Sequence, residues 1–140
     1  MENEMYNSEG YLDPTCYEAL SKIEKENAVR RFRPMVYICS PYSGDIEGNV
    51  ANARRYSRFA VAQGMIPIAP HLLFPQFMDD RNEHERDLAL FMDLAILSKC
   101  AELWSFGSHI SAGMNIEIQR ATSRNQIIRH FTENCEEVIR

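Results

Sequence analysis

Long apolar runs, proline and glycine are scarce in this sequence of 140 residues, which holds 6 glycines and 6 prolines. No apolar run approaches the roughly 18 to 20 residues that a membrane-spanning helix needs. The first ten residues are polar and acidic, whereas a signal peptide is basic and then apolar. Proline and glycine together are too few for a disordered chain. We therefore expect a folded cytoplasmic protein that makes no contact with a membrane.

Lys and Arg are also fewer than Asp and Glu. The chain has 15 Lys and Arg against 20 Asp and Glu, which gives a net charge of −5. The arginines form no long basic patch, so we expect no nucleic-acid polymer as a partner. A small anionic ligand is compatible with this charge, because backbone amides at the start of a helix bind phosphate without a basic surface.

Motifs for metal, cofactor and serine-hydrolase chemistry are absent. The four cysteines form no CxxC pair, which favours buried free thiols over disulfides or zinc. The four histidines lack metal-ligand spacing, so we predict no metal and no cofactor. Without GxSxG, GxxxxGK[ST] or GxGxxG, we expect neither a serine hydrolase nor ATP hydrolysis nor dinucleotide binding. The four cysteines are Cys16, Cys39, Cys100 and Cys135, and the four histidines are His71, His84, His109 and His130.

The spacing of apolar residues predicts a single α/β domain. Short apolar runs at residues 35–39, 65–69, 101–106 and 126–131 indicate strands, and helical spacing covers residues 46–63, 82–99 and 111–121. A strand, a helix and a second strand form a parallel crossover unit. We therefore predict a flavodoxin- or Rossmann-like three-layer fold with a parallel sheet of four or five strands and an extra N-terminal helix.

The boundaries of this domain follow from its flanking segments. A loose tail and a helix that begins at Asp13 and Pro14 are expected over residues 1–33, and the domain itself over residues 34–140. A short last helix is predicted from Thr132. The helix of residues 82–99 is expected to pack through the apolar residues on one of its sides, Leu88, Phe91, Met92, Ala95 and Ile96.

Polar residues gather where the strands are predicted to end. In an open parallel sheet, a ligand lies outside the carboxyl ends of the strands. The segments that follow those ends here are residues 37–44, 70–77 and 107–117, and the apolar character of the loop 71–80 is typical of a pocket wall. The residues expected to bind a ligand or its phosphate are Ser40, Tyr42, Ser43, Gly44, His71, Ser111 and Gly113.

Two carboxylates stand in unusual settings. Glu117 follows Ser111 by six residues, and if Ser111 is the N-cap, the acid lies in the second turn, where the helix dipole favours its ionised form. Asp93 interrupts the apolar helical sequence FMDLAIL, where an unpaired charge is costly. Spacing alone leaves two interpretations open for each residue: a solvated side chain, or one half of the carboxylate pair that glycosidic chemistry requires.

Three segments carry a resemblance to a known family. The segment VYICSPYSG, Asp93 followed by CAELWSFG, and SAGMNIEIQRA together resemble the nucleoside 2-deoxyribosyltransferase superfamily over about residues 35–128. This superfamily includes 2'-deoxynucleoside 5'-phosphate N-hydrolases, and the similarity is greatest to its uncharacterised short phage and bacterial members. Asn115 and Gln119 stand where the characterised enzymes have glycines.

The resemblance implies a catalytic set and a substrate. Glu117 would attack C1' of the sugar to give a glycosyl-enzyme, Asp93 would assist departure of the base, and Tyr37 would orient the glutamate. Ser111 matches the serine that lies near the 5'-phosphate in the nucleotide-cleaving branch. The resemblance also implies a homo-oligomer, a dimer or larger, in which a neighbour completes the pocket.

Two functional hypotheses follow. The first is an enzyme that cleaves or transfers the N-glycosidic bond of a (deoxy)nucleoside 5'-monophosphate through Glu117, with a small nucleoside or nucleotide as its partner. The second is a non-catalytic protein that binds a nucleotide or a nucleotide-derived signal in the same pocket. Asn115 and the apolar loop motivate the second hypothesis.

Overall fold

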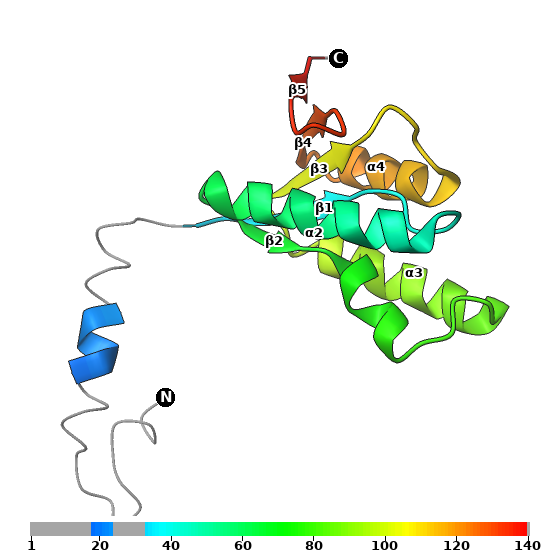
Figure 1. Ribbon diagram of the computed structural model, residues 1–140, viewed down its shortest axis with the longest axis horizontal. Helices are drawn as coiled ribbons and strands as arrows, with labels where there is room; N and C mark the ends of the chain where they lie inside the picture. Colours follow the sequence, from blue (N-terminus) through cyan, green and yellow to red (C-terminus); the bar gives the residue numbers. More distant parts are fainter. Residues whose placement is uncertain (1–17, 24–32, 140) are drawn as a thin grey trace, which may run out of the picture. The chain divides into compact units, whose positions relative to one another are not determined.

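A computed structural model describes residues 18–23 and 33–139 of the chain. The chain divides into two compact units, residues 1–33 and 34–140. In the first unit, residues 18–23 are helical, whereas the expected helix start at Asp13 and Pro14 lies outside the described residues. The second unit contains the sheet and its helices (Figure 1).

The centre of the second unit is a 5-stranded sheet in the order β2-β1-β3-β4-β5. Its strands are β1 (Met35–Cys39), β2 (Ile66–Ile68), β3 (Glu102–Phe106), β4 (Ile127–Phe131) and β5 (Glu137–Val138). The first four strands are parallel, and β5 pairs antiparallel with β4. This is the strand order of flavodoxin-like folds. The predicted fold class is therefore confirmed, with one antiparallel edge strand added.

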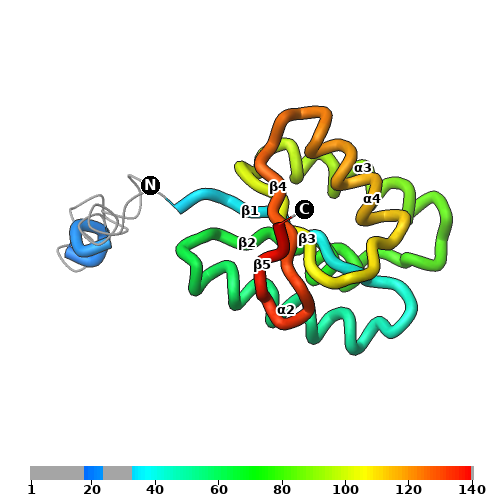
Figure 2. Tube along the Cα trace, turned by 90° about the horizontal axis from the view of Figure 1, so that it is seen from above, coloured from blue at the N-terminus to red at the C-terminus, as the bar shows by residue number. Residues whose placement is uncertain are grey.

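Three helices cover the two faces of this sheet. Helix α2 (Ile46–Ala62) lies on one face, and α3 (Glu83–Leu97) and α4 (Ala112–Ser123) lie on the other (Figure 2). Successive residues of β1 alternate between the two faces, as a strand requires. Val36 and Ile38 join the core beneath α2, and Tyr37 and Cys39 join the core beneath α3 and α4.

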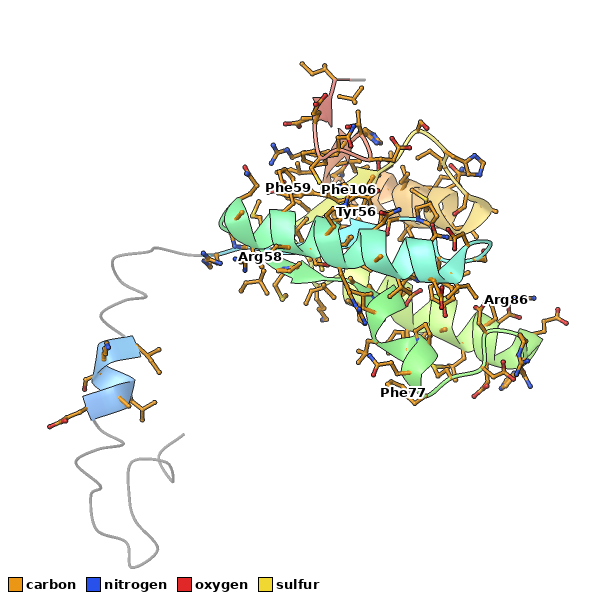
Figure 3. All side chains as sticks on the ribbon, viewed as in Figure 1. Tyr56, Arg58, Phe59, Phe77, Arg86 and Phe106 are labelled. Carbon is orange, nitrogen blue, oxygen red and sulfur yellow. The ribbon has the colours of Figure 1, made fainter. Side chains whose placement is uncertain are left out.

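Aromatic side chains fill the core beneath α2. Tyr56 of α2 stacks on Phe106 of β3 with ring centroids 4.2 Å apart, and Phe59 meets the edge of the same ring (Figure 3). Phe131 of β4 also stacks on Phe106, with the two ring centroids 5.1 Å apart. Because stacked aromatic rings bury large apolar areas, this cluster fixes α2 on the sheet.

Two helix predictions need correction. The side of α3 that faces the protein carries Asp93 and Leu97, whereas Phe91 is 69% exposed and Leu88 44% exposed. Apolar residues occur on both sides of this helix, so periodicity alone selected the wrong side. The helix predicted from Thr132 is also wrong, because residues 132–136 form a turn that leads into β5.

Local hydrogen bonds explain that turn. The Thr132 hydroxyl oxygen accepts from the backbone N–H groups of Asn134 and Glu136, and the Thr132 N–H donates to the Glu136 carbonyl at 2.8 Å. Such side-chain bonds to the backbone compete with helix formation. Cys135 then adopts a left-handed φ of 61°, which reverses the chain.

The strand predicted at residues 65–69 is confirmed but is shorter than predicted, since β2 spans only Ile66–Ile68.

Candidate functional site

A cavity of about 440 Å³ opens beside the carboxyl ends of β1 and β3. Its walls come from the loop after β1, the loop of residues 70–80, one side of α3 and the amino-terminal end of α4. This is where ligands bind in open parallel sheets. The residues from the sequence prediction that line it are Ser40, Tyr42, Ser43, His71, Asp93, Ser111, Gly113 and Glu117.

Glu117 is almost completely buried, with 2% of its surface exposed. Each of its carboxylate oxygens has a donor on β1. The Tyr37 hydroxyl donates a short hydrogen bond to Oε2, and the Cys39 thiol lies 3.6 Å from Oε1. The structure therefore rules out the interpretation of Glu117 as a solvated helix residue, and it brings Tyr37 and Glu117 into direct contact.

Burial dominates the ionisation of this carboxyl. Desolvation raises the pKa of Glu117 from its usual 4.5 to about 7, although the hydrogen bonds from Tyr37 and Cys39 act in the opposite direction. The expectation that the helix dipole keeps Glu117 ionised is therefore too simple. The same burial, together with the negative charge of Glu117, raises the pKa of the Tyr37 hydroxyl far above its usual range, so Tyr37 remains a donor.

Asp93 faces the same cavity from α3. It is 7% exposed, and its Oδ1 is buried without a hydrogen-bond partner among the described residues. Burial and the nearby charge of Glu117 raise the pKa of Asp93 from 3.8 to about 8. The two carboxyls thus differ in affinity for a proton, and near neutral pH Asp93 is the one that holds it. Such a pair can divide the roles of acid and base.

The amino-terminal end of α4 forms the opposite wall. Ser111 is the N-cap, as the sequence predicted, and its Oγ accepts a hydrogen bond from the Met114 N–H at 3.2 Å. Ala112 and Gly113 line the cavity next to it. The first N–H groups of a helix have no acceptor inside the helix, so this end offers donors to an anion. Asn115 is exposed and does not line the cavity.

An aromatic pair lines the cavity beside the end of β1. The rings of Tyr42 and His71 lie 5.5 Å apart between centroids. Burial lowers the pKa of His71, and this effect is opposed by the charge of Asp80 and by a hydrogen bond to the Ser40 backbone. Ser40 is buried, and its Oγ has no hydrogen-bond partner among the described residues. A neutral imidazole and an unpartnered hydroxyl therefore face the ligand space.

Gly44 and His109 do not line this cavity. Gly44 has a φ of +95°, which a glycine adopts without strain, and it turns the chain into α2. Asp45 then caps that helix, with Oδ1 accepting from the Gly48 N–H at 3.1 Å. Gly44 therefore serves the turn. His109 is exposed in the loop after β3.

Sequence reasoning missed two residues of this site. Cys39 follows Tyr37 by two positions, and the alternation of a strand places both on one face. Arg86 precedes Asp93 by about two turns of α3 and lines the same cavity. Helical spacing from Asp93 identifies Arg86, and strand spacing from Tyr37 identifies Cys39.

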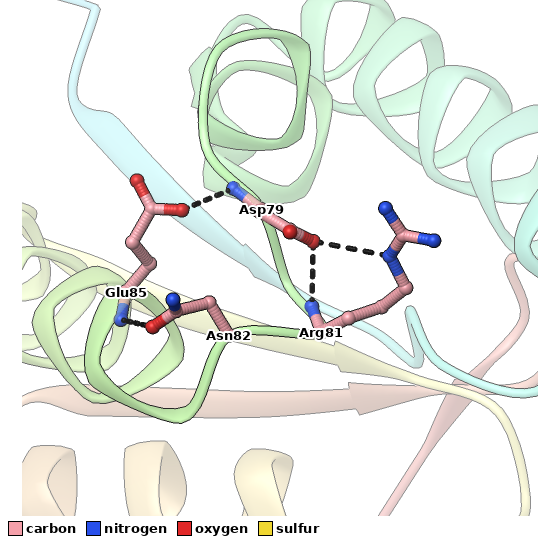
Figure 4. A network of polar contacts seen from close by, with 4 residues as sticks. All are labelled: Asp79, Arg81, Asn82 and Glu85. Carbon is pink, nitrogen blue, oxygen red and sulfur yellow. Dashed lines mark hydrogen bonds and ion pairs between the residues drawn. The ribbon is translucent and has the colours of Figure 1, made fainter.

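A network of polar contacts fixes the start of α3 near Arg86. Asn82 caps the helix by accepting from the Glu85 N–H at 3.1 Å, and Glu85 accepts from the Asp79 N–H at 2.8 Å (Figure 4). Asp79 in turn accepts from the backbone and the guanidinium of Arg81. Arg86 itself projects from the amino-terminal end of α3 (Figure 3). This network therefore fixes the position of the helix that carries Arg86 and Asp93.

Charge and metal-binding capacity also bear on the ligand. The acidic side chains at the cavity are Asp79, Asp80, Glu85, Asp87, Asp93 and Glu117, and among the described residues that line it Arg86 is the lone Lys or Arg. Within residues 18–23 and 33–139, no group of three or more His, Cys, Asp or Glu could hold a metal ion. A separate finding concerns membranes: among residues 18–23 and 33–139, no helix is long and apolar enough to cross one.

Comparison with known proteins identifies the family. The profile of a domain of unknown function, DUF7768, matches residues 34–131. The chain belongs to this family. The described residues that line the cavity lie within the DUF7768 domain. No curated protein sequence matches the chain.

A solved structure shares the fold of this DUF7768 domain. It is that of a 2-deoxyribosyltransferase from the psychrotolerant bacterium Bacillus psychrosaccharolyticus, with a TM-score of 0.55 and 16% sequence identity. The match covers 76% of this chain and 77% of that one. At this identity, the similarity shows a common fold.

Proposed function

We propose that this domain cleaves or transfers the N-glycosidic bond of a nucleoside 5'-monophosphate, with Glu117 as the nucleophile. The observation that carries the proposal is the pair of buried carboxyls at one cavity. Glu117 is held by Tyr37, and Asp93 holds a proton more tightly than Glu117 does. The fold, which a 2-deoxyribosyltransferase also has, is consistent with a nucleoside as the ligand.

The proposed reaction has two steps. In the first, a bond forms between a Glu117 carboxylate oxygen and C1' while the bond from C1' to the base nitrogen breaks. The electron pair of that bond stays on the nitrogen, which accepts the Asp93 proton. In the second, water or another base attacks C1' and frees Glu117, and Asp93 takes up the proton that the attacking group loses. The higher pKa of Asp93 suits the first step, because Asp93 must then hold a proton while Glu117 is ionised.

The 5'-phosphate is assigned to the amino-terminal end of α4. The N–H groups of Ala112 and Gly113 and the Ser111 hydroxyl are donors at this end, and the helix dipole favours an anion there. A methyl group added at Gly113 would meet nothing within 4 Å, so the wall beside it is open. The acidic residues of α3 and the preceding loop make the opposite end of the cavity less favourable for phosphate.

A panel of deoxyribonucleotides and ribonucleotides, with free base measured by liquid chromatography, tests this function. We expect base release that Glu117→Ala abolishes and that the matched surface variant Glu47→Ala leaves unchanged. Ser111→Ala is expected to reduce turnover of monophosphates much more than turnover of the unphosphorylated nucleosides. Turnover that survives Glu117→Ala would contradict the mechanism, and an equal effect of Ser111→Ala on both substrate classes would contradict the phosphate assignment.

A second candidate function is binding of a nucleotide or nucleotide-derived signal without turnover. The apolar wall formed by Phe74, Pro75 and Met78 favours it, since apolar lining with a few polar groups is typical of ligand pockets. Thermal-shift and calorimetric screening distinguish the two functions. Tight binding with the nucleotide recovered intact would support the binder, and failure to bind any nucleotide would reject it.

We also propose that the domain, taken as residues 34–140, assembles as a homo-oligomer. The exposed side of α3 supports this proposal, because Phe91 and Leu88 lie there in a single chain without cover from the described residues. Exposed large apolar side chains that cluster on one helix face often mark protein interfaces.

A further inference from the structure

One thiol contacts the carboxylate of Glu117 directly. Cys39 is 0% exposed, and its Sγ lies 3.6 Å from Glu117 Oε1 and 3.8 Å from the Met114 carbonyl oxygen. Tyr37, two residues earlier on β1, bonds the other carboxylate oxygen. β1 therefore supplies one donor to each oxygen of Glu117. Sequence reasoning assigned Cys39 only a place in the core.

The thiol acts here as a donor and not as a nucleophile. Burial raises the pKa of the Cys39 thiol well above its usual value, and the charge of Glu117 and their hydrogen bond act in the same direction. A protonated thiol is a weak hydrogen-bond donor. A buried carboxylate oxygen without any donor is costly, so an apolar side chain at position 39 would leave Oε1 poorly solvated.

We propose that Cys39 is a positioning residue for Glu117, whose thiol holds Oε1 in the ionised carboxylate and releases it when that oxygen bonds to C1'. This proposal rests on the proposed function for its chemical step. Oε2 is held by the phenol, and Oε1 is held by the weaker donor, so Oε1 is the oxygen that forms the bond to C1'.

The Met114 carbonyl completes this arrangement. When Oε1 becomes part of the glycosyl ester, it loses its negative charge and becomes a poorer acceptor. The S–H of Cys39 can then turn to the Met114 carbonyl, which lies at nearly the same distance. No atom is exchanged in this movement, because only the direction of the thiol hydrogen changes. The weak hydrogen bond from the thiol thus stabilises the carboxylate, and it breaks easily when an electron pair of Oε1 attacks C1'.

Burial has the largest effect on the pKa of Glu117, and three neighbouring groups modify it. Tyr37 and Cys39 of β1 donate to the carboxylate, and Asp93 of α3 couples to it through charge. Removal of the Cys39 donor destabilises the ionised form of Glu117 and leaves the neutral form unaffected. We therefore expect Cys39→Ala to raise the pKa of Glu117 by about half to one unit.

The test measures the pKa of Glu117 by infrared difference spectroscopy in the folded protein without substrate, with Glu117→Gln used to assign the carboxyl band. Cys39→Ala should raise this pKa, and Cys39→Ser, which introduces a stronger donor, should lower it below that of the unmodified protein. Cys100→Ala is the matched control. Cys100 is a buried thiol of the same core cluster, and its Sγ contacts the Ile96 carbonyl at 3.6 Å.

A second spectroscopic readout does not depend on the alanine variant. The S–H stretching band of Cys39, assigned by its loss in Cys39→Ser, should shift as Glu117 titrates and should stop shifting in Glu117→Gln. An unchanged Glu117 pKa in Cys39→Ala, or an S–H band that does not respond to pH near 7, would overturn the proposal. If Cys39→Ala does not fold, the pKa of Cys39→Ser and the S–H band decide the question.

Turnover separates this proposal from the function on which it rests. If the enzyme is active, Cys39→Ala should lower kcat at pH 6 by about three- to tenfold with little change in KM, because less Glu117 is ionised. If no nucleotide is turned over but the spectroscopic shifts appear, the proposed function fails and the contact of Cys39 with Glu117 stands. If turnover depends on Glu117 but Cys39→Ala behaves like Cys100→Ala, the role of Cys39 fails alone.

Discussion

Replacement of Glu117 by glutamine should stabilise the protein at alkaline pH. Burial raises the pKa of Glu117 from 4.5 to about 7, which means that the folded state binds this proton more tightly than the unfolded state does. Folding is therefore favoured at low pH, where the carboxyl is neutral in both states. This advantage is lost as pH rises from about 4.5 through about 7, because the folded protein must then bury a charge.

The size of the effect follows from the same pKa values. They differ by about 2.5, and each pKa unit corresponds to about 1.4 kcal/mol, so the free energy of unfolding should fall by about 3.5 kcal/mol over this pH range on account of Glu117. Glutamine has nearly the same shape and cannot ionise. Glu117→Gln should thus have a stability close to that of the unmodified protein at pH 5 and exceed it by about 3.5 kcal/mol at pH 8.

Urea unfolding followed by circular dichroism at pH 5, 6, 7 and 8 measures this difference. At pH 8 the midpoint should rise by about 1 to 3 M urea. Glu47→Gln, which removes an exposed carboxylate from the first turn of α2, is the matched control and should show no such trend. If the curves of free energy against pH for Glu117→Gln and the unmodified protein run parallel, the inferred burial cost of this carboxylate is wrong.

Three further outcomes test other parts of the structure. Arg86→Gln should lower kcat/KM by about tenfold or more if the guanidinium at the cavity contacts the substrate, whereas Arg58→Gln, the same change at an exposed arginine of α2 outside the cavity, should change it little; equal effects in steady-state kinetics would refute this role. Tyr56→Ala should reduce the free energy of unfolding by about 3 to 5 kcal/mol, measured in urea, because the ring stacks on Phe106 at 4.2 Å. Phe91→Ser should shift the protein toward monomers in light scattering, and an unchanged mass would place the interface elsewhere.

Most of the fold could be predicted from local patterns. The strand at Met35–Cys39 and the helix from Ile46 were located correctly because a continuous apolar run and a helical repeat leave little ambiguity. The end of the chain was predicted wrongly, because its hairpin depends on Thr132 bonding to the backbone and on the pairing of β5 with β4. The buried side of α3 was also missed, since only packing decides between two apolar sides.

The candidate site divides in the same way. The sequence by itself determined which residue types stand at the strand ends. The carboxyl ends of parallel strands lie at the same edge of a sheet, so any parallel sheet brings these residues together. Only the tertiary structure decided their environment. It buried Glu117 beneath Tyr37 and Cys39, left Asp93 Oδ1 without a partner among the described residues, and placed Gly44 outside the cavity. Burial and charge coupling act between residues distant in the chain, so no local pattern contains them.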